Sequence, residues 1–358
     1  MKAFSTSLNA RHIPARLMEP VEGPAGWTPE SLGNVEGWSY HLAEADKAEL
    51  VAATESIRRN GIAPEDVNRD NFKLASFATV LRDMRRELAD GLGIVTVRGF
   101  PVERLDRLGQ CIAYFGLGAY LGLPISQNMK GHILGHVTDL GGDYADPKTR
   151  GYTTRAELPF HTDPSDYVGL LCLQTSKAGG MSRVASSVTL YNRMLKSRPD
   201  LVKALTGDFY RSKVGETNPG EEPWYKRPII LFTNGYFSAN GSGSTIAKAQ
   251  KLPGVPPLTP LQIEALALYN QMAEELAIDI PFKPGDVQFL NNHVCLHSRY
   301  HYEDWPDPAR KRHLLRLWLT DPEGRPIPKD QKEGYAGSGI VPKAVKLNVP
   351  LEATEPVS

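Results

Sequence analysis

The stretch Phe160-His161-Thr162-Asp163 decides how the rest of the sequence is interpreted, together with the apolar run at 167–174 that follows it. His161 and Asp163 lie two positions apart, so on extended backbone their side chains point to the same side. One metal ion can then accept an imidazole nitrogen and a carboxylate oxygen from this segment. Because Pro159 and Pro164 limit regular strand pairing here, we expect the segment at the mouth of a sheet. Short motifs of this kind arise often by chance, so the pair needs a third ligand.

The candidate third ligands follow the strand-like run at 285–292. His297 is the preferred ligand, and His293 is the alternative, with a supporting or structural role. Two imidazoles and one carboxylate suit Fe(II), because this set leaves coordination positions open for a co-substrate and oxygen. The weaker metal candidates are assigned to packing, hydrogen bonding or the substrate pocket: His132, His136 and His301.

Strand patterns dominate the half of the chain that carries these ligands. Predicted strands cover 93–100, 167–174, 182–187, 287–290 and 314–319, with a strand pair at 227–231 and 235–238. Predicted helices cover 43–60, 72–88, 105–121, 190–196, 199–205 and 259–277. In the last helix the expected apolar face is Leu261, Ala265, Leu268, Met272 and Leu276. The pattern favours a mainly β fold with flanking helices, a sandwich or jelly-roll core, over a doubly wound sheet.

The chain resembles the TauD/TfdA family of Fe(II)- and 2-oxoglutarate-dependent dioxygenases. The resemblance is carried, in family order, by four pieces: His161-Thr162-Asp163, Gly179-Gly180-Met181-Ser182, the run at 285–292 that leads to His297, and Arg312-His313-Leu314-Leu315-Arg316. It covers about residues 93–320. Several motifs in the right order are seldom produced by coincidence.

The resemblance implies a double-stranded β-helix (jelly-roll) core with iron bound by His161, Asp163 and His297. It also implies that Arg312 binds the distal carboxylate of 2-oxoglutarate, since a guanidinium pairs with a carboxylate through two hydrogen bonds. Ser182 would donate its hydroxyl to the same carboxylate. Arg316 stays an alternative anchor or a substrate contact, and Arg299 is a third candidate. Without the triad, Arg312 would be interpreted as a surface charge and Ser182 as part of a turn.

The expected function is oxidation, foremost hydroxylation, of a small organic substrate, with O2 as co-substrate and 2-oxoglutarate converted to succinate. Desaturation, ring closure and dealkylation use the same chemistry and stay open. The rival readings are a zinc-dependent hydrolase with the same ligands and a catalytically inactive jelly-roll binding module. We expect the substrate pocket to be lined by 127–136, 143–157 and 236–242, with Tyr152, Trp224 and Tyr225 as candidate surfaces.

The domain organisation, the expected partners and the cellular location complete the prediction. The expected division is an N-terminal arm with helices at 1–92, a dioxygenase-like domain at 93–320 and a C-terminal tail at 321–358. Lys+Arg and Asp+Glu both number 41 in 358 residues, so no net charge points to nucleic acid or an anionic membrane. Three cysteines form no disulfide framework, and no signal peptide or membrane-spanning stretch is recognised. We therefore expect a cytoplasmic protein with a small-molecule substrate, for which a homo-oligomer is an option.

Overall fold

The main sheet of the computed structural model contains seven strands, and most of its members pair in antiparallel fashion. The structure describes residues 12–146, 149–217, 220–241, 243–326 and 345–353. The order of the major sheet is β1 (Ser39–His41), β2 (Ile94–Arg98), β14 (Val287–Asn291), β6 (Tyr167–Gln174), β17 (His313–Thr320) and β3 (Leu123–Pro124), with β4 (Gly135–Val137) also on β17. Only β1 and β2 pair in parallel among the described strands, so the region before residue 93 adds an edge strand to this sheet.

A second sheet carries the candidate ligands. This minor sheet has the order β13 (Ile278–Ile280), β8 (Ser182–Ser186), β15 (Cys295–Arg299) and β5 (Leu158–His161), and all its pairs are antiparallel. A further pair joins β7 (Ala178–Gly179) and β16 (Tyr302–Glu303) beside it. Two sheets with antiparallel strands and helices outside form the predicted jelly-roll core, and the fold prediction is confirmed.

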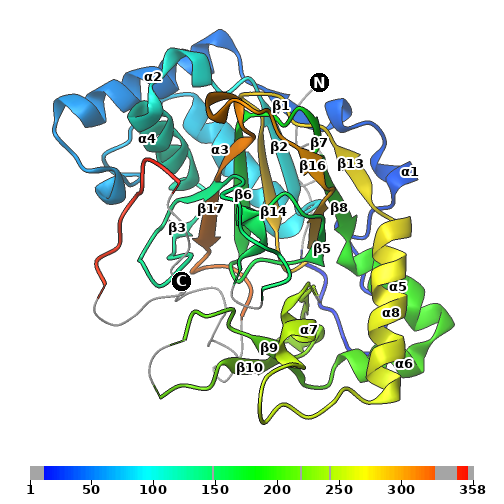
Figure 1. Ribbon diagram of the computed structural model, residues 1–358. Helices are drawn as coiled ribbons and strands as arrows, with labels where there is room; N and C mark the ends of the chain where they lie inside the picture. Colours follow the sequence, from blue (N-terminus) through cyan, green and yellow to red (C-terminus); the bar gives the residue numbers. More distant parts are fainter. Residues whose placement is uncertain (1–11, 147–148, 218–219, 242, 327–344, 354–358) are drawn as a thin grey trace.

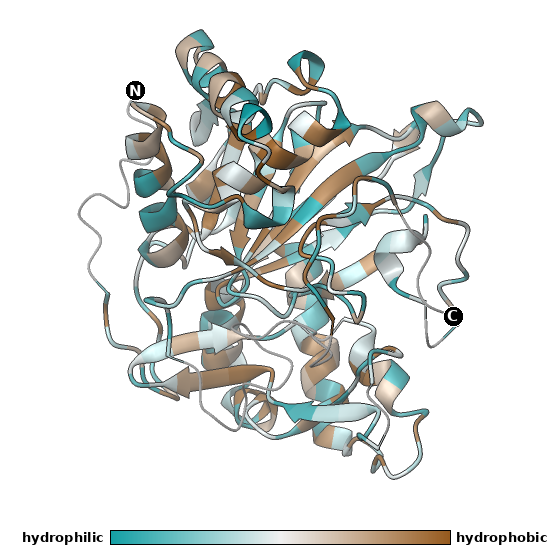
Figure 2. Ribbon diagram, turned by 90° about the vertical axis from the view of Figure 1, so that its left-hand side faces the viewer, coloured by the Kyte–Doolittle hydropathy of each residue, from teal (hydrophilic) through white to brown (hydrophobic). Residues whose placement is uncertain are grey.

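Helices cover the two sheets on opposite sides (Figure 1). The helices α2 (Glu44–Arg59), α3 (Phe77–Asp90) and α4 (Arg107–Gly118) share one apolar core with the major sheet. The helices α5 (Ser187–Ser197), α6 (Pro199–Leu205) and α8 (Pro260–Glu275) share the other core with the minor sheet. In Figure 2 the central strands are largely hydrophobic, as burial on both faces requires. No helix in the described part of the chain is both long and apolar enough to cross a membrane.

A segment between β8 and β13 adds structure that belongs to neither sheet. It holds two strand pairs, β9 (Phe209–Ser212) with β10 (Trp224–Arg227) and β11 (Ile230–Thr233) with β12 (Tyr236–Ala239). It also holds the short helix α7 (Thr245–Ala249), while α1 (Pro29–Leu32) lies near the start of the chain. The predicted strand pair is present, but β11 begins at Ile230 and not at residue 227, and the turn lies at Asn234 and Gly235, one residue later than expected.

Most predicted elements lie where the sequence placed them, and some details were wrong. The predicted helix at 72–88 begins only at Phe77, because the carboxylate of Glu49 in α2 accepts the backbone N–H groups of Ala75, Ser76 and Phe77. These bonds fix the preceding residues outside the helix and cap its first turn.

The predicted apolar face of α8 is confirmed in part. Ala265 and Leu276 are buried, and Leu268 and Met272 pack partly buried against the core, whereas Leu261 is exposed. The buried face also contains Leu266, Tyr269 and Ala273, which were not predicted. Packing of α8 against α6, α5 and the minor sheet determines which of its residues are buried. The expected N-terminal arm is described only from residue 12, where it packs on the body through bonds such as Met18 N–H to the Tyr191 hydroxyl, 3.0 Å. Residues 327–344 and 354–358 of the expected tail lie outside the described residues.

Candidate metal centre and adjoining cavity

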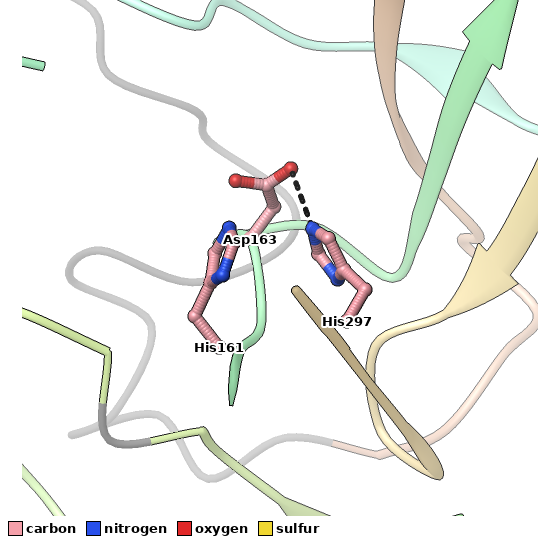
Figure 3. Close-up of side chains that lie close together, drawn as sticks. All are labelled: His161, Asp163 and His297. Carbon is pink, nitrogen blue, oxygen red and sulfur yellow. Dashed lines mark ion pairs between the residues drawn. The ribbon is translucent and has the colours of Figure 1, made fainter. Parts of the chain in front are cut away.

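The three candidate ligands converge on one point at the mouth of the jelly roll. His161 ends β5 and lies directly opposite His297 of β15 in the strand pairing, so the two imidazole centroids are 4.2 Å apart. Asp163 follows β5, and its Oδ2 is 3.8 Å from Nε2 of His297 (Figure 3). One ligand atom from each of the three residues lies within 4.8 Å of the others. These distances are short enough for a single metal ion to contact all three residues.

Neighbouring groups orient the ligands. Nδ1 of His161 is 2.8 Å from the carbonyl oxygen of Pro159, which leaves Nε2 of this ring for a metal. The amide side chain of Asn292 accepts a hydrogen bond from the backbone N–H of Asp163, 3.1 Å, and donates to the carbonyl oxygen of Ser165, 2.9 Å. On the other side of Asp163, Nη1 of Arg316 is 3.5 Å from Oδ1. The backbone and the carboxylate of Asp163 are thus held independently.

The charge states of the three residues suit a divalent cation. Burial, with a smaller effect of the neighbouring His161, lowers the pKa of His297 to about 3, and burial also lowers the pKa of His161. Burial alone would raise the pKa of Asp163, but Arg316, His297 and His161 lower it below its ordinary value. Two neutral imidazoles and one carboxylate are the protonation states that bind Fe(II). Oδ2 of Asp163 is also buried and has no hydrogen-bond partner in the described part of the chain, and a cation at this point would satisfy it.

Arg312 lies in a buried polar cluster, not on the surface. Its side chain is 4% exposed, so the surface-charge alternative is wrong. Nη2 donates to the carbonyl oxygen of Gly180, 3.3 Å, while Nη1 is buried without a hydrogen-bond partner among the described residues. The guanidinium lies over the ring of Tyr302, 5.2 Å from its centroid. A buried guanidinium with an unsatisfied donor is a site for an anionic group.

Ser182 and Arg299 extend this cluster. Ser182 belongs to β8 and donates its hydroxyl to Oε1 of Gln288, 3.3 Å, so it is a strand residue and not a turn residue. Its partner across the strand pair is Arg299. The guanidinium of Arg299 also lies over the ring of Tyr302, 4.8 Å from its centroid. Arg299 donates to the carbonyl oxygen of Thr154, 2.9 Å, and its Nε and Nη1 are buried without a partner in the described structure.

Arg316 occupies a different place from Arg312. Besides Asp163, its Nε donates to Oε1 of Gln127, 2.9 Å, and the guanidinium lies over Tyr152 and Trp318 at 4.5 and 4.7 Å. It contacts a candidate ligand and lines the adjoining cavity. Arg312 does not line this cavity among the described residues.

The remaining histidines lie away from the centre. Nε2 of His293 lies 2.7 Å from Oδ1 of Asp166 in a buried pair, which fits the structural role that the sequence analysis gave as the alternative for this residue. Nδ1 of His136 is 2.8 Å from Nε2 of His313, and His132 lies beside Asn128. His301 is exposed. None of these groups reaches the cluster of His161, Asp163 and His297 that the described residues form.

A cavity of about 750 Å³ opens beside His161 and Asp163. Parts of the predicted lining are present: Met129, Tyr144, Thr149, Arg150, Gly151, Tyr152, Asn240, Gly241, Trp224 and Tyr225. Residues 147–148 and 242 of the predicted loops lie outside the described part of the structure. From β10 the sequence predicted only Trp224 and Tyr225, and it did not predict the contributions of β9 and α7, so that Arg211, Arg227 and Lys248 were missed. The strands β9 and β10 have four residues each, too short for a clear periodic signal.

The fold and the chain match known oxygenases. The structure of asparagine oxygenase with Fe(II), 2S,3S-3-hydroxyasparagine and succinate superposes with a TM-score of 0.60 at 19% identity, covering 78% of this chain and 93% of that one. The non-heme iron oxygenase OrfP with Fe and alpha-ketoglutaric acid gives a TM-score of 0.58 at 16% identity, over 79% and 94% of the two chains. These likenesses establish the fold.

Sequence comparison establishes the family. FR-33289 synthase of Streptomyces rubellomurinus is 32% identical over 324 residues, covering 87% of this chain and 94% of that protein. The taurine hydroxylase-like protein SAT17 of Stachybotrys chartarum is 30% identical over 326 residues, covering 87% and 83%. The family model described as taurine catabolism dioxygenase TauD, TfdA family matches residues 55–318. With a jelly roll and a His-Asp-His centre at the positions that the motifs predict, this chain belongs to the TauD/TfdA family of Fe(II)- and 2-oxoglutarate-dependent dioxygenases.

Proposed function

We propose that His161, Asp163 and His297 hold Fe(II), that Arg312 and Ser182 bind the distal carboxylate of 2-oxoglutarate, and that the enzyme hydroxylates a small organic molecule in the adjoining cavity. The observation that carries the proposal is the convergence of two neutral imidazoles and one ionised carboxylate within 4.8 Å. The bound iron supplies oxidation of a C–H bond by O2, coupled to conversion of 2-oxoglutarate into succinate and carbon dioxide. Two structural neighbours are complexes with a hydroxylated amino acid and succinate, which supports hydroxylation as the outcome.

The protein's own residues prepare this centre. Pro159 fixes the His161 ring, Asn292 fixes the backbone of Asp163, and the positive charge of Arg316 favours the ionised form of Asp163. Groups held in this way keep their geometry without reorganisation when substrate arrives. Arg316 therefore acts in our proposal as a positioning residue for Asp163 that also faces the substrate.

The Arg312 cluster supports the choice of anchor. Its unsatisfied guanidinium donor and the Ser182 hydroxyl belong to one buried region with Arg299 and Tyr302, and a carboxylate there would accept hydrogen bonds from several donors. Arg299 would add a second positive charge. A zinc hydrolase would leave this buried cluster without a task, which favours the dioxygenase over that rival.

We also propose a cytoplasmic location, based on the cysteines. Cys111, Cys172 and Cys295 are buried and form no disulfide. Burial raises the pKa of the Cys111 and Cys172 thiols to about 12, so they stay protonated and unreactive. Free buried thiols of this kind suit a reducing compartment.

Anaerobic titration of the protein with Fe(II) and 2-oxoglutarate tests the assignment. The chelate should give a weak visible absorption band, which His161→Ala should abolish. Arg312→Gln should weaken 2-oxoglutarate binding about 10- to 100-fold, as loss of a charged hydrogen bond predicts. The matched control is Arg310→Gln, in the same basic run but exposed and over the ring of Trp305. An unchanged band in His161→Ala, or equal effects at positions 310 and 312, would contradict the proposed roles.

A further inference from the structure

Arg211 and Arg227 place two positive charges on one wall of the cavity. In the pairing of β9 with β10, Arg211 lies opposite Tyr225 and Phe209 lies opposite Arg227. Arg211 and Arg227 are therefore diagonal neighbours on the same face of the strand pair. Both line the cavity, and both are nearly buried, with 4% and 5% of their surface exposed.

Arg211 keeps unused hydrogen-bond donors inside this wall. Nη1 donates to the carbonyl oxygen of Gly241, 2.7 Å, whereas Nε and Nη2 are buried and have no hydrogen-bond partner among the described residues. Burial lowers the pKa of Arg211, and burial together with Arg211 lowers the pKa of Arg227. Burial of a positively charged guanidinium costs free energy unless a neighbouring anion compensates its charge.

Several other cations of the cavity are paired with carboxylates, and Lys248 donates to the backbone carbonyl oxygens of Asp146 and Thr149. Arg150 lies 3.5 Å from Glu216, and Lys213 lies 3.2 Å from Glu221. Lys226, on the strand beside Arg211, is exposed and lies 3.9 Å from Asp208. In the described structure no such carboxylate contact exists for Arg211. An anionic group of a ligand would supply this compensation.

The position of Arg211 links this wall to the metal centre. Gly241, which accepts the bond from Arg211, packs so closely on the candidate ligand His161 that a Cβ on the glycine would lie 2.4 Å from the His161 Cα. The N–H of Gly241 also faces the Thr162 hydroxyl at 3.3 Å. A group bound at Arg211 would thus lie beside the segment that carries two candidate ligands, in the cavity that His161 and Asp163 also line.

We propose that Arg211 and Arg227 form a subsite for an anionic oxygen group of the substrate, so that the enzyme acts on a small organic acid. The carboxylate, sulfonate and phosphonate groups share this recognition chemistry, since each offers several acceptor oxygens to guanidinium donors. This subsite is separate from the Arg312 cluster, where 2-oxoglutarate is expected. The inference rests on the proposed function, because it names the substrate class of the same site.

The test measures binding of three probes to the full-length protein loaded with Fe(II) and 2-oxoglutarate under anaerobic conditions. The probes are acetate, methanesulfonate and methylphosphonate, with acetamide as the uncharged counterpart, and the readout is the rise in melting temperature with probe concentration. At least one anion should stabilise the wild type, and Arg211→Gln should bind it about 10- to 100-fold more weakly. The probe that binds best identifies the anionic group.

Three further measurements keep the result interpretable. The matched control Lys226→Gln removes a charge from the neighbouring strand and should bind the probe like the wild type. Arg211→Lys retains the charge without the planar fork and should lose several-fold in affinity, which serves if Arg211→Gln does not fold. In a panel of small organic acids and their methyl esters, only the acids should stimulate succinate release.

The visible band separates the two proposals. If the wild type forms no band, the proposed function fails. If the band forms but no anion binds more tightly to the wild type than to Arg211→Gln, or Lys226→Gln loses as much affinity, the subsite is overturned. Stimulation by esters as strong as by acids overturns it as well.

Discussion

Gly241 is the position where one added methyl group would test the geometry of the metal centre. In Gly241→Ala the new Cβ would lie 2.4 Å from the His161 Cα, about 1 Å inside the 3.4 Å at which ordinary contacts begin. The glycine segment cannot retreat easily, because Asn240 donates its N–H to the Ile229 carbonyl at 2.7 Å and its side-chain amide to the Pro228 carbonyl at 2.9 Å. His161 is held in turn by its pairing with His297.

The displacement is large compared with the tolerance of a metal site. Ligand distances must hold to within about 0.2 Å, so a shift of about 1 Å at His161 should disrupt coordination. We expect a loss of about 100-fold in kcat/KM, as misplacement by about 1 Å typically causes. Overpacking should also lower the free energy of unfolding by about 1–3 kcal/mol.

Anaerobic Fe(II) titration and steady-state succinate release measure the two effects of Gly241→Ala. The control is Gly37→Ala, whose Cβ would meet no atom within 4 Å and which should behave like the wild type. If Gly241→Ala binds Fe(II) and turns over like the wild type, the close packing of residue 241 on the ligand segment does not govern the centre, and the reasoning is wrong.

Three other perturbations probe the supports of the site and the fold. Asn292→Ala removes the acceptor for the Asp163 N–H and should weaken Fe(II) binding about 10- to 100-fold by titration, whereas unchanged affinity would exclude a positioning role. Phe289→Ala empties a fully buried position of β14 and should cost about 3–5 kcal/mol in urea unfolding. Burial alone would raise the pKa of Asp166, but hydrogen bonds from His293, the Asp321 N–H and the Thr320 hydroxyl lower it. A carboxyl of this kind stabilises the fold above its ordinary pKa of about 3.9 and loses that contribution at lower pH. Asp166→Asn should therefore flatten the acid limb of the stability curve, and an unchanged slope would show that Asp166 does not contribute to it.

Local patterns in the sequence predicted much of the fold. The strand β6 has the predicted bounds, and α2 differs by one residue at each end. In each of these elements the residues favour one type of secondary structure, and the apolar residues recur with the period of that same structure. The late start of α3 was not predictable, because it depends on Glu49, a residue of another helix about 26 positions earlier in the chain.

The candidate site was predictable to the extent that it depends on spacing and on the family motifs. His161 and Asp163 follow from their separation and His297 from its place after the strand-like run, whereas the role of Arg312 required the resemblance. The direct opposition of His161 and His297 is a matter of strand register, which no local pattern encodes. Arg211 and Arg227 were missed because their importance depends on burial and, for Arg211, on donors without a partner among the described residues, and neither property can be seen in a four-residue strand.

The cavity wall formed by β9 and β10 has a consequence for how the enzyme can be altered. These strands pair with each other and, among the described strands, with no strand of either sheet. Apart from Arg211, which bonds to Gly241 beside His161, their side chains can therefore change without disturbing the register that aligns His161 with His297. In the proposed assignment, substrate selectivity and oxygen chemistry belong to separately mutable parts of the chain. Engineering of new substrate preferences should begin at this wall and leave the paired histidine strands intact.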